Sequence, residues 1–534
     1  MKTFLSISLF LVLAFGSIAF GQQSGSVPSS LSESPQVDNS QQTDQSLAEQ
    51  ARRVRKDHSE EVKLTPADEK ELFAAVDRIS AFASEDSGLA LHGPVKRRVI
   101  GPDEVEKSTR ERLSGKDYDD RFARSELTMK KFGLLPRTFD LKEFIIKTRR
   151  KEIGGYYDNE TKTISLLNTI PVEQQGAILA HELTHALQDQ NYDLRVWMKA
   201  GVLPNDKKEA PAASDESMEA RHAVVEGQAM VVFADYLLAP SGHSLLNSPG
   251  LIYRMEDPAV KAAPDSQLLH DAPIIVRATG TFPYHEGLIF EGELLQAVGR
   301  KMAFAGVFAN PPRNTHEVMQ PHAYLAHEKS PSLPFPDAHA LLGDSYEIYD
   351  SGCVGELDVQ ALLWQLGTRT LADDLSKSWL GGAYMAFRKK GAGVPTSGDL
   401  ELFYISGWNS AIAAQRFAKF YVDSVARRYE KAELSTPLPC SASECPKAIS
   451  EIDTEEGPVI VELWKDNTVV VSESFDKETA AKLSAATRTA NHKNAEAASF
   501  QQEIGSHLYD VPAFRQVQES LGQEILRQIA QQNR

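Results

Sequence analysis

Cysteine is scarce in this chain of 534 residues, which holds three of them. A dense disulfide framework is therefore excluded as its main source of stability. Cys440 and Cys445 lie close together in "PCSASECP" and are able to close a small loop, whereas Cys353 has no near partner in the sequence. We interpret Cys353 as a buried thiol, with a metal ligand as the alternative.

Positive charge is also in short supply, because 57 Lys and Arg stand against 74 Asp and Glu, for a formal net charge of −17. Nucleic-acid binding rests on clustered Lys and Arg that neutralise phosphates, and no basic stripe with interleaved aromatics occurs. No nucleic-acid partner is expected. We interpret the acidic surplus as a means of staying soluble, with a part in choosing substrates as the alternative.

The first residues, "MKTFLSISLFLVLAFGSIAFGQQ", combine one early lysine, an apolar run and small residues before Gln22. This pattern predicts a signal peptide over 1–21, cleaved after Gly21, and hence a secreted or periplasmic protein without stable membrane insertion. An uncleaved membrane anchor is the alternative. No cysteine follows the apolar run, so lipid attachment there is excluded. Residues 22–64 are Ser/Gln-rich and are expected to be a disordered leader, either a spacer or an activation peptide.

The remaining chain shows no internal repeat and is predicted to be α+β. Residues 65–345 are expected to form a mainly helical domain, in which Thr65 caps the first helix and "IGGYYDNETKTISLL" forms a β-hairpin. Residues 346–495 are expected to form a separate C-terminal α+β domain, because two strands followed by a helix occur twice. Residues 496–534 are predicted to be a polar helical tail.

The stretch "AILAHELTHALQDQ" has a helical pattern that puts His181 and His185 one turn apart on one face. Two imidazoles so placed can bind one metal ion such as Zn²⁺, and Glu182 beside them can take the proton of a water that attacks a carbonyl. The pattern also occurs by chance on helices, so a metal-free helical protein is an alternative.

A zinc site needs a third protein ligand, and the natural donor is a carboxylate on a following helix. "VVEGQA" offers Glu226, whose next residue is a glycine that lets another backbone come close. The apolar residues around Glu226 predict that it is at least partly buried; they are Val224, Val225, Ala229 and Val232. Glu219, seven residues earlier on the same face, is the competing ligand or a partner for a histidine.

The combination of "HELTH" with "VEGQA" resembles the gluzincin clan of zinc metallopeptidases, in which a glutamate followed by glycine on the second helix is the third ligand. The wider context is similar to a family of bacterial exported, peptidase-MA-like proteins over roughly residues 90 to 475. The motifs that carry this similarity are "GGYYDNETKTI", "HELTHALQDQ", "VVEGQA", "FPYHEGLIFEGELL", "PPRNTHEVMQPHAY", "GELDVQALLWQLG" and "GWNSAIAAQRFA". The resemblance implies a zincin-like fold.

The resemblance further implies that His181, His185 and Glu226 bind zinc and that Glu182 is the general base and acid. It also implies that the strand near Tyr156 and Tyr157 borders the cleft, where an extended peptide can pair with its edge. Two residues depart from the family pattern. Gln228 stands where an acidic residue is expected, and Gln320 where a histidine is expected before proline.

A peptidase also needs a hydrogen-bond donor for the oxyanion of the tetrahedral intermediate. Tyr284 in "FPYHEG" is the first candidate, with a packing role as the alternative; the others are His285, His316 and His322. Asp189, four residues after His185, is placed either to orient an imidazole or to bond a neighbouring loop.

These features predict an exported zinc metallopeptidase that hydrolyses extended polypeptides. The alternative is a catalytically inactive, zincin-fold binding or scaffold protein of the cell envelope. The sequence offers no pattern that names a preferred substrate side chain.

Overall fold

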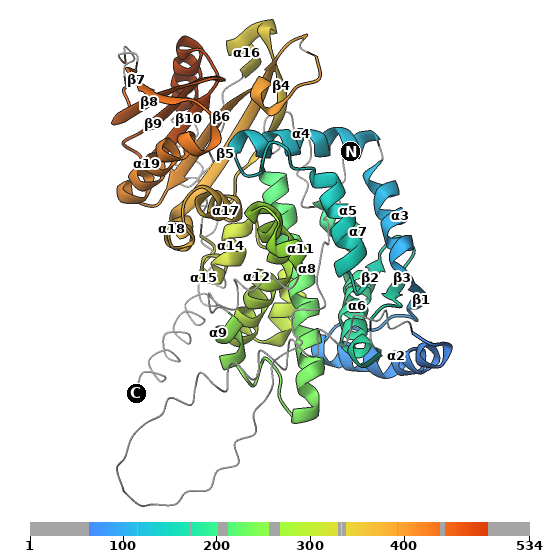
Figure 1. The fold of residues 1–534 in the computed structure, drawn as a ribbon. Helices are drawn as coiled ribbons and strands as arrows, with labels where there is room; N and C mark the ends of the chain where they lie inside the picture. The colour runs from blue at the N-terminus through green and yellow to red at the C-terminus, as the bar shows by residue number, and fades with distance from the viewer. Residues whose placement is uncertain are drawn as a thin grey trace, which may run out of the picture.

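A computed structural model describes residues 64–114, 116–170, 172–200, 212–255, 267–328, 333, 338–391, 393–437, 440 and 444–489. The predicted signal peptide, the leader up to residue 63 and the helical tail lie outside the described residues. Within them the chain is a mixed α+β protein, as predicted, and it contains a large antiparallel sheet. Figure 1 shows that sheet on one side of the molecule and the long helices α6, α8 and α12 on the other.

The first described helix, α2 (Pro66–Ser87), begins where the sequence predicts. The Thr65 side chain accepts a hydrogen bond from the Asp68 N–H, and the Asp68 carboxylate accepts one from the Thr65 N–H. This reciprocal capping box satisfies two backbone donors that the first helical turn leaves without partners. The buried face of α2 then packs on α6 (Val172–Tyr192).

A small sheet lies beside α6. It has the order β1-β3-β2, with β1 (Lys96–Ile100) parallel to β3 (Thr163–Leu167) and β2 (Gly155–Asp158) antiparallel to it. Strands β2 and β3 are the predicted hairpin. Among the described residues β2 has a strand neighbour on one side only, so it is an edge strand of this sheet.

The other elements of this part are helical. They are α3 (Pro102–Leu113), α4 (Lys116–Phe132), α5 (Leu141–Glu152), α7 (Leu194–Ala200), α8 (Ala212–Leu238), η1 (Ala239–Ser241), α9 (Gly250–Met255), α11 (Gln267–His270), α12 (Ile274–Val298), the π-helical turn η2 (Met302–Gly306), α13 (Val307–Ala309), α14 (Thr315–Met319), α15 (Pro321–Leu325), α16 (Ala338–Leu342) and η3 (Gly343–Ser345). Helix α8 is apolar and long enough to cross a membrane, but 78% of its most apolar window is buried inside the protein. It is therefore a core helix in this fold.

The large sheet has seven antiparallel strands in the order β4-β5-β6-β10-β9-β8-β7. The strands are β4 (Tyr346–Cys353), β5 (Trp379–Lys389), β6 (Leu400–Trp408), β7 (Ala432–Ser435), β8 (Ala448–Thr454), β9 (Gly457–Leu463) and β10 (Thr468–Glu473). The helices of this part are α17 (Glu356–Leu366), α18 (Arg369–Leu375), η4 (Ser376–Ser378), η5 (Ser397–Asp399), α19 (Ala411–Arg428) and one over 477–489. The predicted disulfide Cys440–Cys445 lies between β7 and β8.

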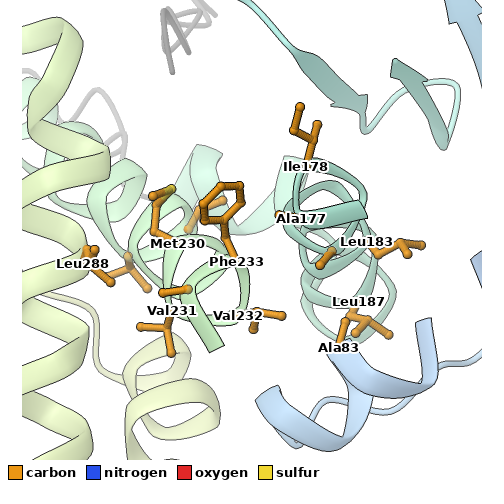
Figure 2. Packing of buried hydrophobic residues seen from close by; sticks show 14 of the residues in the cluster. Ala83, Ala177, Ile178, Leu183, Leu187, Met230, Val231, Val232, Phe233 and Leu288 are labelled. Atoms are coloured by element: carbon orange, nitrogen blue, oxygen red, sulfur yellow. The ribbon is translucent and has the colours of Figure 1, made fainter. Parts of the chain in front are cut away.

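Two of the three hydrophobic cores in the described residues hold these parts together. Figure 2 shows the first core, in which side chains from α2, α6, α8 and α12 meet, with Leu187 of α6 beside Ala83 of α2. The second core joins the inner face of the large sheet to α17 and α19, and it also takes up residues of α4, α5 and the start of α12. Helix α12 therefore runs through both cores.

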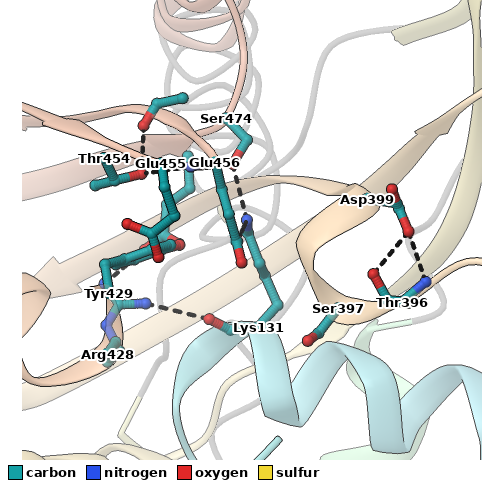
Figure 3. A network of polar contacts seen from close by, with 12 residues as sticks. Lys131, Thr396, Ser397, Asp399, Arg428, Tyr429, Thr454, Glu455, Glu456 and Ser474 are labelled. Carbon is teal, nitrogen blue, oxygen red and sulfur yellow. Dashed lines mark hydrogen bonds and ion pairs between the residues drawn. The ribbon is translucent and has the colours of Figure 1, made fainter. Parts of the chain in front are cut away.

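A buried ion pair adds to the contact between α4 and the large sheet. The Lys131 ammonium is fully buried and lies 2.8 Å from Glu456 Oε2 and 2.8 Å from Ser474 Oγ (Figure 3). Phe132, the next residue, packs edge-on against Tyr384 and Tyr404 of the sheet. The predicted boundary at residue 346 therefore lies within a continuous set of contacts, and two separate domains stay a prediction.

Candidate metal centre

Helix α6 supplies two histidines to one point in the interior. His181 and His185 lie one helical turn apart, both are buried, and their Nε2 atoms are 3.0 Å apart. Their rings stand edge to face. Helix α6 fixes these side chains firmly, because α2 packs on one of its sides and α8 on another.

Helix α8 adds the carboxylate that the sequence singles out. Glu226 Oε2 lies 3.2 Å from the Nε2 atom of His181 and 3.2 Å from that of His185. Within the described part of the chain, these three residues form the one group of His, Cys, Asp or Glu that can hold a metal ion. Glu226 is 4% exposed, as its apolar neighbours predict, and Glu219 is outside the group.

The approach of α8 to α12 depends on two glycines. A methyl group on Gly227 would lie 2.3 Å from the Gly287 carbonyl oxygen, and one on Gly287 would lie 2.3 Å from that of Ala223. Only glycine permits this contact between backbones, as the sequence predicts for Gly227. It brings α12 beside Glu226 and places Tyr284, one turn before Gly287, over His181 with ring centroids 6.2 Å apart.

The pKa values of Glu226 and His185 are shifted in opposite directions by their mutual contact. Burial raises the pKa of the Glu226 carboxyl, but His185, His181 and His222 outweigh burial and hold that pKa well below its usual value. Burial lowers the pKa of His185, but the negative charge of Glu226 outweighs it and raises the value to about 9. Both shifts favour an ionised Glu226 carboxylate and a protonated His185 ring near neutral pH when no metal is bound. A metal ion has to displace that proton when it binds.

The spacing of the donor atoms fits a metal ion. Two ligands of one tetrahedral zinc ion, each about 2.0–2.1 Å from it, lie about 3.3 Å apart. The three separations here are 3.0, 3.2 and 3.2 Å. Two imidazoles and one carboxylate can thus converge on a single point, and the group could hold a metal ion.

Glu182 stands beside this group without belonging to it. It is buried, and its Oε2 atom has no hydrogen-bond partner among the described residues. Burial raises the pKa of the Glu182 carboxyl, while the two histidines and the backbone N–H of Tyr157 oppose that rise. The Tyr157 N–H of strand β2 thus interacts with the Glu182 carboxyl, and the Oε2 atom of that carboxyl is still able to accept or donate a proton.

Tyr284 is the remaining predicted catalytic residue, and the fold brings it to the site. Burial, together with the charges of Glu226 and Glu182, raises the pKa of the Tyr284 hydroxyl well above its usual value. The hydroxyl also interacts with Glu226 by a hydrogen bond. It therefore stays protonated and is able to donate at any physiological pH.

The other candidates lie elsewhere or have other partners. Asp189 accepts hydrogen bonds from the Tyr157 hydroxyl and the Leu194 N–H, so it bonds the neighbouring hairpin and loop rather than an imidazole.

His316 and Gln320 both contact Glu356 of α17. His285 pairs with Glu286, and His322 is exposed. The Cys353 thiol donates to the Gly382 carbonyl and is outside the metal-binding group.

Two residues of the site escape prediction from the sequence. His222 Nε2 lies 3.3 Å from Glu226 Oε1, and its position four residues before Glu226 was a usable signal. Gln188 Oε1 lies 2.9 Å from His185 Nδ1, and no pattern marks that residue beforehand.

Comparisons of the chain with protein-family models, with curated proteins and with solved structures gave no match. What this metal-binding group can do therefore has to follow from its own atoms.

Proposed function

We propose that this protein is a zinc-dependent metallopeptidase with a zincin-like helical core. The observation that carries the proposal is the convergence of His181, His185 and Glu226, with donor separations of 3.0–3.2 Å, beside the buried carboxyl of Glu182. Two imidazoles with one carboxylate are a ligand set that catalytic zinc sites use, leaving a fourth position for water or substrate. The identity of the metal is part of the proposal.

His181, His185 and Glu226 would hold the ion. Zinc, when bound in such a site, lowers the pKa of water and polarises the scissile carbonyl. Glu182 takes the proton of the attacking water and delivers it to the leaving amine, for which its buried, unpaired Oε2 atom is suited. The Tyr284 hydroxyl donates a hydrogen bond to the oxygen that becomes negative in the transition state.

An extended polypeptide is the substrate class that fits best. Strand β2 is an edge strand, and the Tyr157 N–H within it interacts with Glu182. A peptide paired with this edge would pass directly by the carboxyl that moves the proton. Action outside the cytosol agrees with the disulfide Cys440–Cys445 and with the apolar N-terminal sequence.

The test compares glutamate-to-glutamine variants in zinc binding and in peptide cleavage. Glu182→Gln is expected to bind one equivalent of zinc and to lose turnover by several orders of magnitude, because the amide cannot move the proton. Glu226→Gln is expected to lose zinc, whereas Glu219→Gln, on the same helix, keeps it. Tyr284→Phe should keep zinc and substrate affinity and lower kcat. Metal analysis measures the zinc content of each variant, and mass-spectrometric profiling of a peptide library measures its cleavage activity.

Two results would contradict the proposal in different ways. A wild-type protein that holds full zinc but cleaves no member of the library would point to the inactive binding or scaffold protein. A wild-type protein that binds no zinc in equilibrium dialysis would remove the metal site itself.

A further inference from the structure

Two buried glutamine side chains connect His185 to the π-helical turn η2. Gln188 lies one turn after His185 on α6, and Gln228 lies two residues after Glu226 on α8. Gln188 Oε1 is 2.9 Å from His185 Nδ1, and Gln188 Nε2 is 2.9 Å from Gln228 Oε1. Gln228 Nε2 then lies 3.0 Å from the carbonyl oxygen of Ala303 and 3.0 Å from that of Phe304.

The carbonyl groups of η2 fix the donor and the acceptor of each hydrogen bond in this series, from η2 back to His185. A backbone carbonyl can only accept, so the two carbonyls of η2 require the NH₂ group of Gln228 to face them. Its oxygen must then face Gln188, which donates to it. The Val225 carbonyl, 3.0 Å from Gln188 Nε2, independently requires the NH₂ group of Gln188 at the same place. The oxygen of Gln188 is left for His185.

We propose that Gln188 and Gln228 are positioning residues that keep a proton on Nδ1 of His185 and thereby reserve its Nε2 lone pair for the metal. Gln188 accepts from Nδ1–H and cannot donate to it, so the neutral ring is held in the form whose free nitrogen points at Glu226. The inference rests on the metal site of the proposed function, and it adds how that site is prepared.

The same amide also ties the two ligand-bearing helices together. Gln188 belongs to α6, and the Val225 carbonyl that it binds belongs to the residue before Glu226 on α8. Both glutamines are fully buried, so water does not compete for these bonds. His181 differs, because its Nδ1 atom has no partner within the described part of the chain. The control over ring orientation that we infer is therefore specific to His185.

The experiment removes the amide while keeping the shape of the side chain. Gln188→Met is expected to weaken zinc binding by about 10- to 100-fold, as the loss of such supporting partners does elsewhere. Gln188→Glu keeps an acceptor for Nδ1–H but loses the NH₂ group that faces the Val225 carbonyl and Gln228 Oε1, so it is expected to recover only part of the zinc affinity that Gln188→Met loses. The matched control is Gln175→Met, because Gln175 is an equally buried amide of α6 whose hydrogen bonds among the described residues go to the Leu167 and Ile170 carbonyls. It should lose stability but keep zinc affinity, measured by chelator competition.

A second measurement follows the proton itself. In protein with ¹⁵N-labelled histidine, the Nδ1–H of His185 is expected to exchange slowly with water, with or without zinc, and to exchange faster in Gln188→Met. The resonance is assigned by its loss in His185→Asn. Unchanged exchange in Gln188→Met, or equal zinc loss in Gln175→Met, would overturn the inference. If the wild type binds no zinc, the proposed function fails. The exchange measurement still decides whether Gln188 holds the proton on Nδ1 of His185.

Discussion

At the scale of single residues, Glu216 of α8 predicts a pH dependence of stability that can be tested without an activity assay. It is buried, and its Oε2 atom accepts hydrogen bonds from the Thr315 N–H and hydroxyl. Burial and the nearby charge of Asp358 raise its pKa from 4.5 to about 8. The folded protein therefore binds this proton more tightly than the unfolded chain does. Its contribution to stability is complete below pH 4.5 and is lost as the pH rises through about 8.

Glu216→Gln should remove that part of the pH dependence, because the amide keeps the shape and the acceptor but has no charge to lose. We expect the free energy of unfolding of the wild type to fall by roughly 2–5 kcal/mol more than that of the variant between about pH 4.5 and 8. Denaturant unfolding at several pH values, with a chelator present throughout, measures the difference. Equal slopes in the two proteins would show that Glu216 ionises normally.

Some residues of the site can be predicted from local sequence patterns, whereas others depend on contacts between segments that are distant in the sequence. His181, Glu182 and His185 follow from spacing within one helix, and Glu226 follows from the need for a third ligand and from its apolar neighbours. Gln188 could not be predicted, because its role depends on contacts with α8 and η2 that no local pattern encodes.

At the scale of elements, the close contact between α8 and α12 lies beside Glu226 of the candidate metal site. Gly227→Ala would put a methyl group 2.3 Å from the Gly287 carbonyl oxygen, so the two helices would have to move apart beside Glu226. We expect a loss of about 1–3 kcal/mol in the free energy of unfolding, with weaker zinc binding. Gly250→Ala is the matched control, because a methyl group there meets nothing within 4 Å. It should leave stability unchanged or slightly higher.

Thermal unfolding and chelator competition on both variants measure these effects. A Gly227→Ala protein with wild-type stability and zinc affinity would contradict the idea that this glycine sets the distance between the helices.

Local patterns predicted elements well where the burial pattern was strong. The predicted hairpin forms, and the pattern of two strands followed by a helix appears twice, as β5, β6 and α19 and as β9, β10 and the helix over 477–489. Strands β4, β7 and β8 were missed. They are rich in polar residues, β4 and β7 are the edges of the sheet, and only two of the seven residues of β8 are buried. Their strand conformation comes from pairing with distant neighbours, which single-sequence patterns do not contain.

At the scale of the whole molecule, shared cores argue against independent unfolding of the two parts. Ile275 and Val276 of α12 belong to the core of the large sheet, whereas Phe282 and Leu288 of the same helix belong to the core around α6. Lys131 of α4 is buried against Glu456 of the sheet region. The sequence could not show this, because each core joins segments more than a hundred residues apart.

Zinc is therefore expected to stabilise the entire described structure as one unit. At about 100 times its Kd, a ligand that binds only the folded state adds about 2.7 kcal/mol. The metal site lies in α6 and α8, whereas four of the five tryptophans, Trp364, Trp379, Trp408 and Trp464, lie in the part with the large sheet. Saturating zinc should raise the melting temperature by the same amount in tryptophan fluorescence and in circular dichroism, and His181→Ala should abolish both shifts. A zinc shift seen in circular dichroism but not in fluorescence would mean that the sheet unfolds on its own, in spite of the helix that crosses both cores.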